Sequence, residues 1–128
     1  MKLGYVVLYV PDVEAAVSFY EKAFGVTRRS PHPSGAYAEL ETGSTAFGFA
    51  SEELVCGLFQ EFRRNRPDEP PAGVGVAFVT DDVPAAYARA LAAGAVPYVA
   101  PVTRPSGQVL SYVRDLNGFL VEMCSVVG

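Results

Sequence analysis

The strongest constraint on the fold is an internal repeat. The segment 5–25, YVVLYVPDVEAAVSFYEKAFG, returns in degraded form about seventy residues later. Both copies contain an apolar run, an acidic residue (Asp12, then Asp82), alanines at helical spacing and a closing glycine (Gly25, then Gly94). Because a solenoid needs three or more copies, two copies in 128 residues indicate a duplicated domain.

Each copy predicts a strand, a helix and then two or three further strands. Asp12 and Asp82 stand where a helix N-cap is expected, directly after an apolar run typical of a buried strand. Gly25 and Gly94 close these helices. Apolar alternation and turn residues predict the remaining strands. The expected strands are residues 5–10, 36–41, 45–50, 74–79, 97–102, 109–114 and 119–125.

The two copies, about 1–51 and 73–126, are expected to form a single domain of residues 1–128 with a connector over about 52–72. Leu54, Leu58 and Phe62 recur at helical spacing, which predicts a helix over 53–66. A proline-rich linker follows at 67–71. A helix covers one face of each sheet, so the other faces must be buried elsewhere or line a cleft.

Composition and charge exclude several classes of protein. A formal net charge of -4 gives no electrostatic basis for binding nucleic acid or an anionic membrane. No apolar run approaches the ~20 residues that cross a bilayer. The first residues run into a strand pattern without a leader, so we expect a cytoplasmic protein. Cys56 and Cys124 are expected to be buried, reduced thiols.

The strings YVPDVEAAVSFYEKAFG and SYVRDLNGFLVEMC, in this order, carry a family resemblance. The chain resembles the vicinal-oxygen-chelate superfamily, which contains glyoxalase I, extradiol dioxygenases, fosfomycin-resistance enzymes and bleomycin-binding proteins. The resemblance covers essentially the whole chain. It implies an α+β fold in which two tandem βαβββ modules form a cup-shaped mixed β-sheet barrel with helices outside, and it implies a homodimer. Since this fold hosts unrelated chemistries, only the site can indicate the function.

In metal-dependent members of that superfamily, four strand positions hold a divalent ion, two from each module. The resemblance places these positions at Tyr5, Gly48, Gly75 and Glu122. Only Glu122 keeps a ligand identity, because glycine has no side chain and one carboxylate with one phenol suits such an ion poorly. His32 is the only histidine and lies in a proline-rich loop away from these positions. We therefore expect no metal ion and no other cofactor.

Strand alternation adds neighbours to these four positions. Val7 and Tyr9 share a face with Tyr5, which predicts a mostly apolar pocket for an organic ligand. Glu122 has apolar neighbours, so it is expected to be buried and to need a partner, either a structural one such as the Tyr5 hydroxyl or a cationic ligand. No catalytic residue is assigned. The candidate ligand-binding residues are Tyr5, Val7, Tyr9, Gly48, Gly75, Tyr112, Arg114 and Glu122.

The sequence leaves open which face of two later strands lines the cleft. Tyr37, Glu39 and Glu41 share one face of the strand at 36–41, and Tyr112 and Arg114 share one face of the strand at 109–114. If they face the cleft, these groups could bind a cationic or hydroxyl-rich ligand. The two glutamates could also act as general acid and base, or lie on a solvated outer face.

Three functions remain open, and a binding protein is favoured over an enzyme. The first function is metal-independent binding of a small organic molecule, such as a drug or antibiotic, as in the bleomycin-resistance branch. The second is a lyase, isomerase or dioxygenase with a non-standard metal site, or a metal-free catalyst that uses Glu122 or Tyr5. The third is a regulatory or structural dimer with a vestigial cleft. The expected partners are a small organic ligand and a second copy of the chain, with no nucleic acid and no membrane.

Overall fold

Both acidic residues of the repeat cap helices, as predicted. In the computed structural model, which describes residues 1–29 and 35–126, Asp12 Oδ1 accepts a hydrogen bond from the Ala15 amide at 3.0 Å. Asp82 Oδ1 accepts one from the Ala85 amide at 3.1 Å. The helices that follow are α1 (Val13–Phe24) and α3 (Val83–Ala92). Gly25 ends α1 in the left-handed conformation, with φ of 70°, which glycine adopts without a Cβ penalty.

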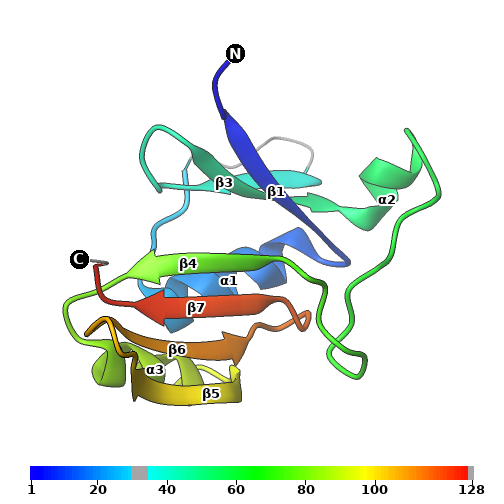
Figure 1. Ribbon diagram of the computed structural model, residues 1–128. Coiled ribbons are helices and arrows are strands. Elements are labelled where there is room, and N and C mark those ends of the chain that lie inside the picture. Colours follow the sequence, from blue (N-terminus) through cyan, green and yellow to red (C-terminus); the bar gives the residue numbers. More distant parts are fainter. Residues whose placement is uncertain (30–34, 127–128) are drawn as a thin grey trace. The chain divides into compact units, whose positions relative to one another are not determined.

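The chain divides into two units, and the first spans residues 1–64. Its sheet has the order β1-β3-β2 (Figure 1). The strand β1 (Tyr5–Val10) is parallel to β3 (Ala46–Ser51), and β2 (Tyr37–Leu40) is antiparallel to β3. Residues 27–29 run along β2, where the Arg29 amide donates to the Glu39 carbonyl at 2.9 Å. They stand in for a fourth strand, so this unit is a βαβββ module with one shortened strand.

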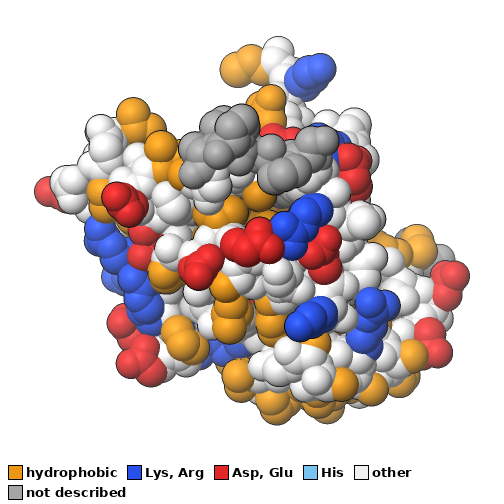
Figure 2. All heavy atoms as spheres, turned by 180° about the vertical axis from the view of Figure 1, so that it is seen from behind, with side chains coloured by type: hydrophobic (Ala, Val, Ile, Leu, Met, Phe, Trp, Pro, Cys, Tyr) orange, Lys and Arg blue, Asp and Glu red, His pale blue; other side chains and the backbone are white. Residues whose placement is uncertain are grey.

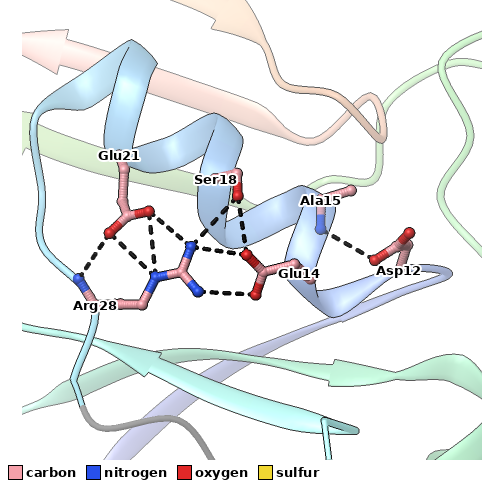
Figure 3. Close-up of polar contacts among 6 residues, drawn as sticks. All are labelled: Asp12, Glu14, Ala15, Ser18, Glu21 and Arg28. Atoms are coloured by element: carbon pink, nitrogen blue, oxygen red, sulfur yellow. Dashed lines mark hydrogen bonds and ion pairs between the residues drawn. The ribbon is translucent and has the colours of Figure 1, made fainter.

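The shortened strand is tied to α1 through Arg28 (Figure 3). Its guanidinium forms ion pairs with Glu14 and Glu21 of α1, each at 2.8 Å. Hydrogen bonds from Arg28 hold the pKa of both carboxyl groups below their ordinary value. The contacts fix where the chain turns after α1.

The second unit, from residue 65 onward, contains a complete βαβββ module. Its sheet has the order β4-β7-β6-β5 (Figure 1). The strands are β4 (Gly75–Val79), β5 (Val96–Thr103), β6 (Val109–Arg114) and β7 (Leu120–Cys124). The β4 and β7 strands are parallel, whereas β6 is antiparallel to both of its neighbours. The helix α3 packs against β5 and β6. Two sheets with few helices confirm the mixed α+β class.

Alternate strand residues form the core beneath the helices, as the sequence predicts. The Tyr20 ring of α1 lies 5.5 Å from the ring of Phe47 and 5.0 Å from that of Phe49, measured between centroids. In the second unit, Val121 and Met123 are buried. Burying each large apolar side chain contributes about 1.5–3 kcal/mol. The opposite faces of the two sheets therefore carry the candidate site residues.

The helix predicted over 53–66 is wrong. The helix α2 covers only Glu52–Cys56 and ends at Gly57, whose amide donates to the Leu54 carbonyl. Leu58 is 82% exposed, so the regular apolar spacing does not form a buried stripe. The Gln60 side chain donates to the Cys56 carbonyl at 2.6 Å and occupies an acceptor that a continuing helix would use.

The later part of the connector is held to the turn between β6 and β7. Asn65 is buried; its side-chain amide donates to the Asn117 carbonyl at 2.9 Å and accepts from the Ala72 amide at 3.1 Å. Arg114 donates to the Pro67 carbonyl at 3.2 Å. Among the described residues, no helix has the length and apolar character required to cross a membrane.

Candidate functional site

In the first unit, the sheet face opposite the core brings together four candidate residues. Leu8 and Val10 are 5% and 0% exposed, and they point into the core. Tyr5, Val7 and Tyr9 alternate with them and so lie on the other face. Val7 pairs directly with Gly48 of β3, which places Gly48 in the same row.

The surroundings of Gly48 show which face of β2 joins this site. A Cβ at Gly48 would lie 3.2 Å from the Tyr37 hydroxyl and 3.4 Å from Glu39 Cγ. Tyr37 and Glu39 therefore share the face of Tyr5, Val7 and Gly48. That this face lines a cleft stays a prediction. The same Cβ would lie 2.8 Å from the Ala38 carbonyl oxygen. The space at Gly48 is therefore filled rather than open.

The acids on this face are bound to an arginine that sequence reasoning missed. Arg29 contacts Glu39 Oε1 at 3.0 Å and Glu41 Oε1 at 2.9 Å. The Tyr37 hydroxyl donates to Glu39 Oε2 at 2.8 Å. Burial, followed by the contact with Glu39, raises the pKa of Tyr37 to about 12. The arginine balances the charge on Glu39, and Tyr37 stays a neutral phenol at ordinary pH.

In the second unit, Glu122 has a phenol partner. The Tyr112 hydroxyl donates to Glu122 Oε1 at 2.9 Å across the β6–β7 pair, so Tyr112 lies on the Glu122 face. Burial and the nearby Glu122 carboxylate raise the pKa of the Cys124 thiol. Within residues 1–29 and 35–126, no basic side chain forms an ion pair with Glu122. Its side chain is half-buried.

The two sheets have equivalent registers. Glu39 pairs with Gly48 in the first unit, and Tyr112 pairs with Glu122 in the second. Val7 pairs with Gly48 as Ala77 pairs with Glu122. Gly48 is therefore the counterpart of Glu122, which is the correspondence expected from the repeat. In the first unit the carboxylate lies one strand over, at Glu39, which is the counterpart of Tyr112.

Arg114 and Gly75 have surroundings that the sequence did not reveal. The Arg114 guanidinium donates to the carbonyls of Arg66, Glu69 and Gly118 at 3.1, 2.6 and 2.9 Å, as well as to Pro67. Arg114 thus secures the connector, and its role toward a ligand stays a prediction. Gly75 is exposed, and a Cβ there would meet no atom of the described residues within 4 Å.

The residues at the four positions that the resemblance assigns to a metal do not fit a divalent ion. Gly48 and Gly75 offer no donor atom, and a side chain at Gly48 would collide with the Ala38 carbonyl. Tyr5 is 65% exposed, and Glu122 is the one carboxylate. Among the described residues, no group of three His, Cys, Asp or Glu side chains could hold a metal ion. His32 lies outside the described residues.

The two cysteines are both free thiols. Cys124 is buried as expected, whereas Cys56 is only half-buried. A separate open hollow of about 440 Å³ lies beside α2 and contains none of the candidate residues. It is lined by Ala36, Ser51, Glu53, Leu54 and Gly57.

Two βαβββ modules in equivalent register, with candidate residues on the faces opposite the helices, define a class of duplicated α+β proteins. Residues 2–123 match the family model described as the Glyoxalase/Bleomycin resistance protein/Dioxygenase superfamily. The chain belongs to this superfamily. A comparison with curated proteins finds no match.

Several solved structures share the fold of this chain. A glyoxalase-related enzyme from Fulvimarina pelagi has a TM-score of 0.82 and 19% identity, over 98% of this chain and 88% of that one. A glyoxalase/bleomycin resistance protein/dioxygenase family enzyme from Burkholderia phytofirmans PsJN has a TM-score of 0.77 and 23% identity, over 99% and 100% of the two chains. A glyoxalase/bleomycin resistance protein/dioxygenase from Nocardioides has a TM-score of 0.74 and 22% identity, over 99% and 84%. At these identities the likeness establishes the fold alone.

Proposed function

We propose that this protein binds a small organic molecule bearing a basic or hydrogen-bond-donating group, without a metal ion. The observation that carries the proposal is Glu122, a half-buried carboxylate held by Tyr112 and not paired with a cation among the described residues. A carboxylate that is partly withdrawn from water is stabilised by a charged donor. The ligand supplies that donor. A cytoplasmic role in sequestering a drug or antibiotic is consistent with this chemistry.

The proposal includes a cup-shaped pocket and a homodimer. The cup is supported by candidate residues on the helix-free face of each sheet and by the family resemblance. The homodimer is supported by β5, where Val96, Tyr98 and Val102 are 50%, 54% and 42% exposed. Figure 2 shows hydrophobic side chains gathered along the lower edge of the second unit, where Figure 1 draws α3 and β5. A second copy of the chain in an isologous contact would cover them.

Metal independence is tested by elemental analysis. The protein is exposed to Ni, Co, Fe, Mn and Zn, dialysed and assayed for bound metal. We expect no stoichiometric retention. Near-stoichiometric retention that Glu122→Gln abolishes would contradict the proposal and would favour a lyase, isomerase or dioxygenase.

Ligand binding is tested by thermal shift with cationic aromatic compounds and their neutral isosteres. A ligand present at 100 times its Kd stabilises the folded protein by about 2.7 kcal/mol, which is a measurable rise in Tm. Glu122→Gln should remove the preference for the cationic compounds. Glu61→Gln is a matched control, since it removes an exposed acid. Equal responses of the two variants would count against Glu122 as the recognition group.

A further inference from the structure

Three aromatic rings of the first unit form a cluster beside the candidate sheet face. The Tyr9 ring lies 5.6 Å from that of Phe62 and 6.3 Å from that of Phe59, and Phe59 and Phe62 are 5.9 Å apart. Tyr9 belongs to β1 and points away from the core. We call Tyr9, Phe59 and Phe62 the aromatic cluster.

The early end of α2 creates this cluster. The amides of Leu58 and Phe59 both donate to the Val55 carbonyl, at 2.8 and 3.1 Å, in a turn that closes α2. The following residues leave the helical path, and Phe59 and Phe62 pack against Tyr9. Phe59 remains 45% exposed, so the cluster presents ring surface to a ligand.

A guanidinium group lies over the same cluster. Arg64 Cζ is 4.5 Å from the centroid of the Phe62 ring. Arg64 Nη2 donates to Cys56 Sγ at 3.0 Å, and a thiol is a weak acceptor. In residues 1–29 and 35–126 this is the one hydrogen bond of the Arg64 guanidinium, which has five N–H donors. The Tyr9 hydroxyl has no hydrogen-bond partner within those residues either.

We infer that the aromatic cluster and Arg64 form a binding site for a planar aromatic carboxylate. The ligand ring packs against the exposed surface of Phe59, in the edge or offset geometries that aromatic pairs favour. The ligand carboxylate accepts hydrogen bonds from the planar fork of Arg64, which matches carboxylate geometry. The Tyr9 hydroxyl is a further donor close to the rings. This site goes beyond the proposed function, because it selects an anionic ligand and does not use Glu122.

The test is calorimetric titration of the full chain with naphthoic acid at neutral pH. We expect saturable binding. Naphthalenemethanol lacks the anion and cyclohexanecarboxylate lacks the aromatic ring, so each should bind at least about tenfold more weakly. Arg64→Gln should weaken naphthoate binding about tenfold, and Arg64→Lys should restore part of the loss. Phe59→Leu should weaken the binding of both naphthoate and naphthalenemethanol.

Arg63→Gln is the matched control, because Arg63 is the exposed neighbour of Arg64 in the chain. Equal affinities of the Arg63 and Arg64 variants would overturn the inference, as would equal affinities for naphthoate and naphthalenemethanol. Absence of naphthoate binding at millimolar concentration would overturn it as well.

Glu122→Gln separates this inference from the proposed function. This variant should leave naphthoate affinity unchanged while it removes the preference for cationic compounds. Loss of naphthoate binding in Glu122→Gln would overturn the assignment to the aromatic cluster. Failure of the cationic screen with intact naphthoate binding would contradict the proposed function alone.

Discussion

Gly48 and Gly75 stand at two positions that the resemblance assigns to a metal, yet they differ in their surroundings. A Cβ at Gly48 would lie 2.8 Å from the Ala38 carbonyl oxygen, whereas a Cβ at Gly75 would meet no atom within 4 Å in the part of the chain that the structure describes. We expect Gly48→Ala to lower the free energy of unfolding by about 1–3 kcal/mol, because β2 must shift to admit the methyl group. Gly75→Ala should change it by less than about 0.5 kcal/mol. Urea titration of both variants measures the difference. Equal free energies of unfolding would show that β2 shifts to admit the methyl group without loss of stability.

The phenol of Tyr37 provides a second test at a single residue. Its pKa is raised to about 12, first by burial and then by Glu39. The folded state thus holds this proton more tightly than the unfolded chain, so the stabilisation is complete below pH 10.0 and is lost as the pH rises toward about 12. Absorbance titration of wild type against Tyr37→Phe isolates this phenol. Glu39→Gln should lower its pKa without abolishing the shift, and an unchanged titration would exclude Glu39 as a cause.

The ion pairs between α1 and Arg28 predict that the attachment of α1 to residues 27–29 weakens in acid. Arg28 depresses the pKa of Glu14 and Glu21, so these carboxyl groups stabilise the fold above their ordinary pKa of 4.5. That stabilisation is lost as the pH falls through the depressed values. The urea midpoint of wild type should therefore fall more steeply below pH 4.5 than that of Arg28→Gln. If the urea midpoints of the two proteins change in parallel with pH, the ion pairs are too well solvated to stabilise the fold.

The later part of the connector, residues 66–71, contains no helix or strand and depends on Arg114. Its guanidinium donates to carbonyls of Arg66, Pro67 and Glu69. Replacement by methionine leaves these acceptors to water, so we expect Arg114→Met to cost about 2 kcal/mol and to speed proteolysis within 66–71. Arg104→Met, in the exposed turn between β5 and β6, is the control. Equal cleavage rates of the two variants would contradict this role for Arg114.

Local patterns predicted the elements whose signal is local. Strand alternation and the caps at Asp12 and Asp82 placed the strands and α1 and α3 within a residue or two. Apolar spacing failed over 53–66 because the same spacing also suits a turn whose aromatic residues fold back onto Tyr9. The contact of Phe59 and Phe62 with Tyr9 joins residues far apart in the chain, so the local sequence pattern cannot predict it.

At the scale of the whole molecule, the repeat and the family resemblance indicated two modules, and both are present. Alternation identified which candidate residues share a face, whereas the faces of β2 and β6 needed the strand register. The pairing of Tyr112 with Glu122 follows from that register, whereas the hydrogen bond from Arg114 to the Pro67 carbonyl is a tertiary contact that no strand pairing sets. The ion pairs of Arg29 could have been predicted from its positive charge and from its place shortly before the segment that contains Glu39 and Glu41.

The filled space at Gly48 has a consequence for redesign of the first unit. Because the Ala38 carbonyl and the Tyr37 hydroxyl surround the space that a side chain at position 48 would occupy, Gly48→Glu alone would displace both of them. A carboxylate at this position would require a smaller residue at Tyr37 and a shift of β2, so the effects of the two substitutions on stability would not be additive. New binding chemistry on this face is therefore easier to introduce at exposed positions than at Gly48.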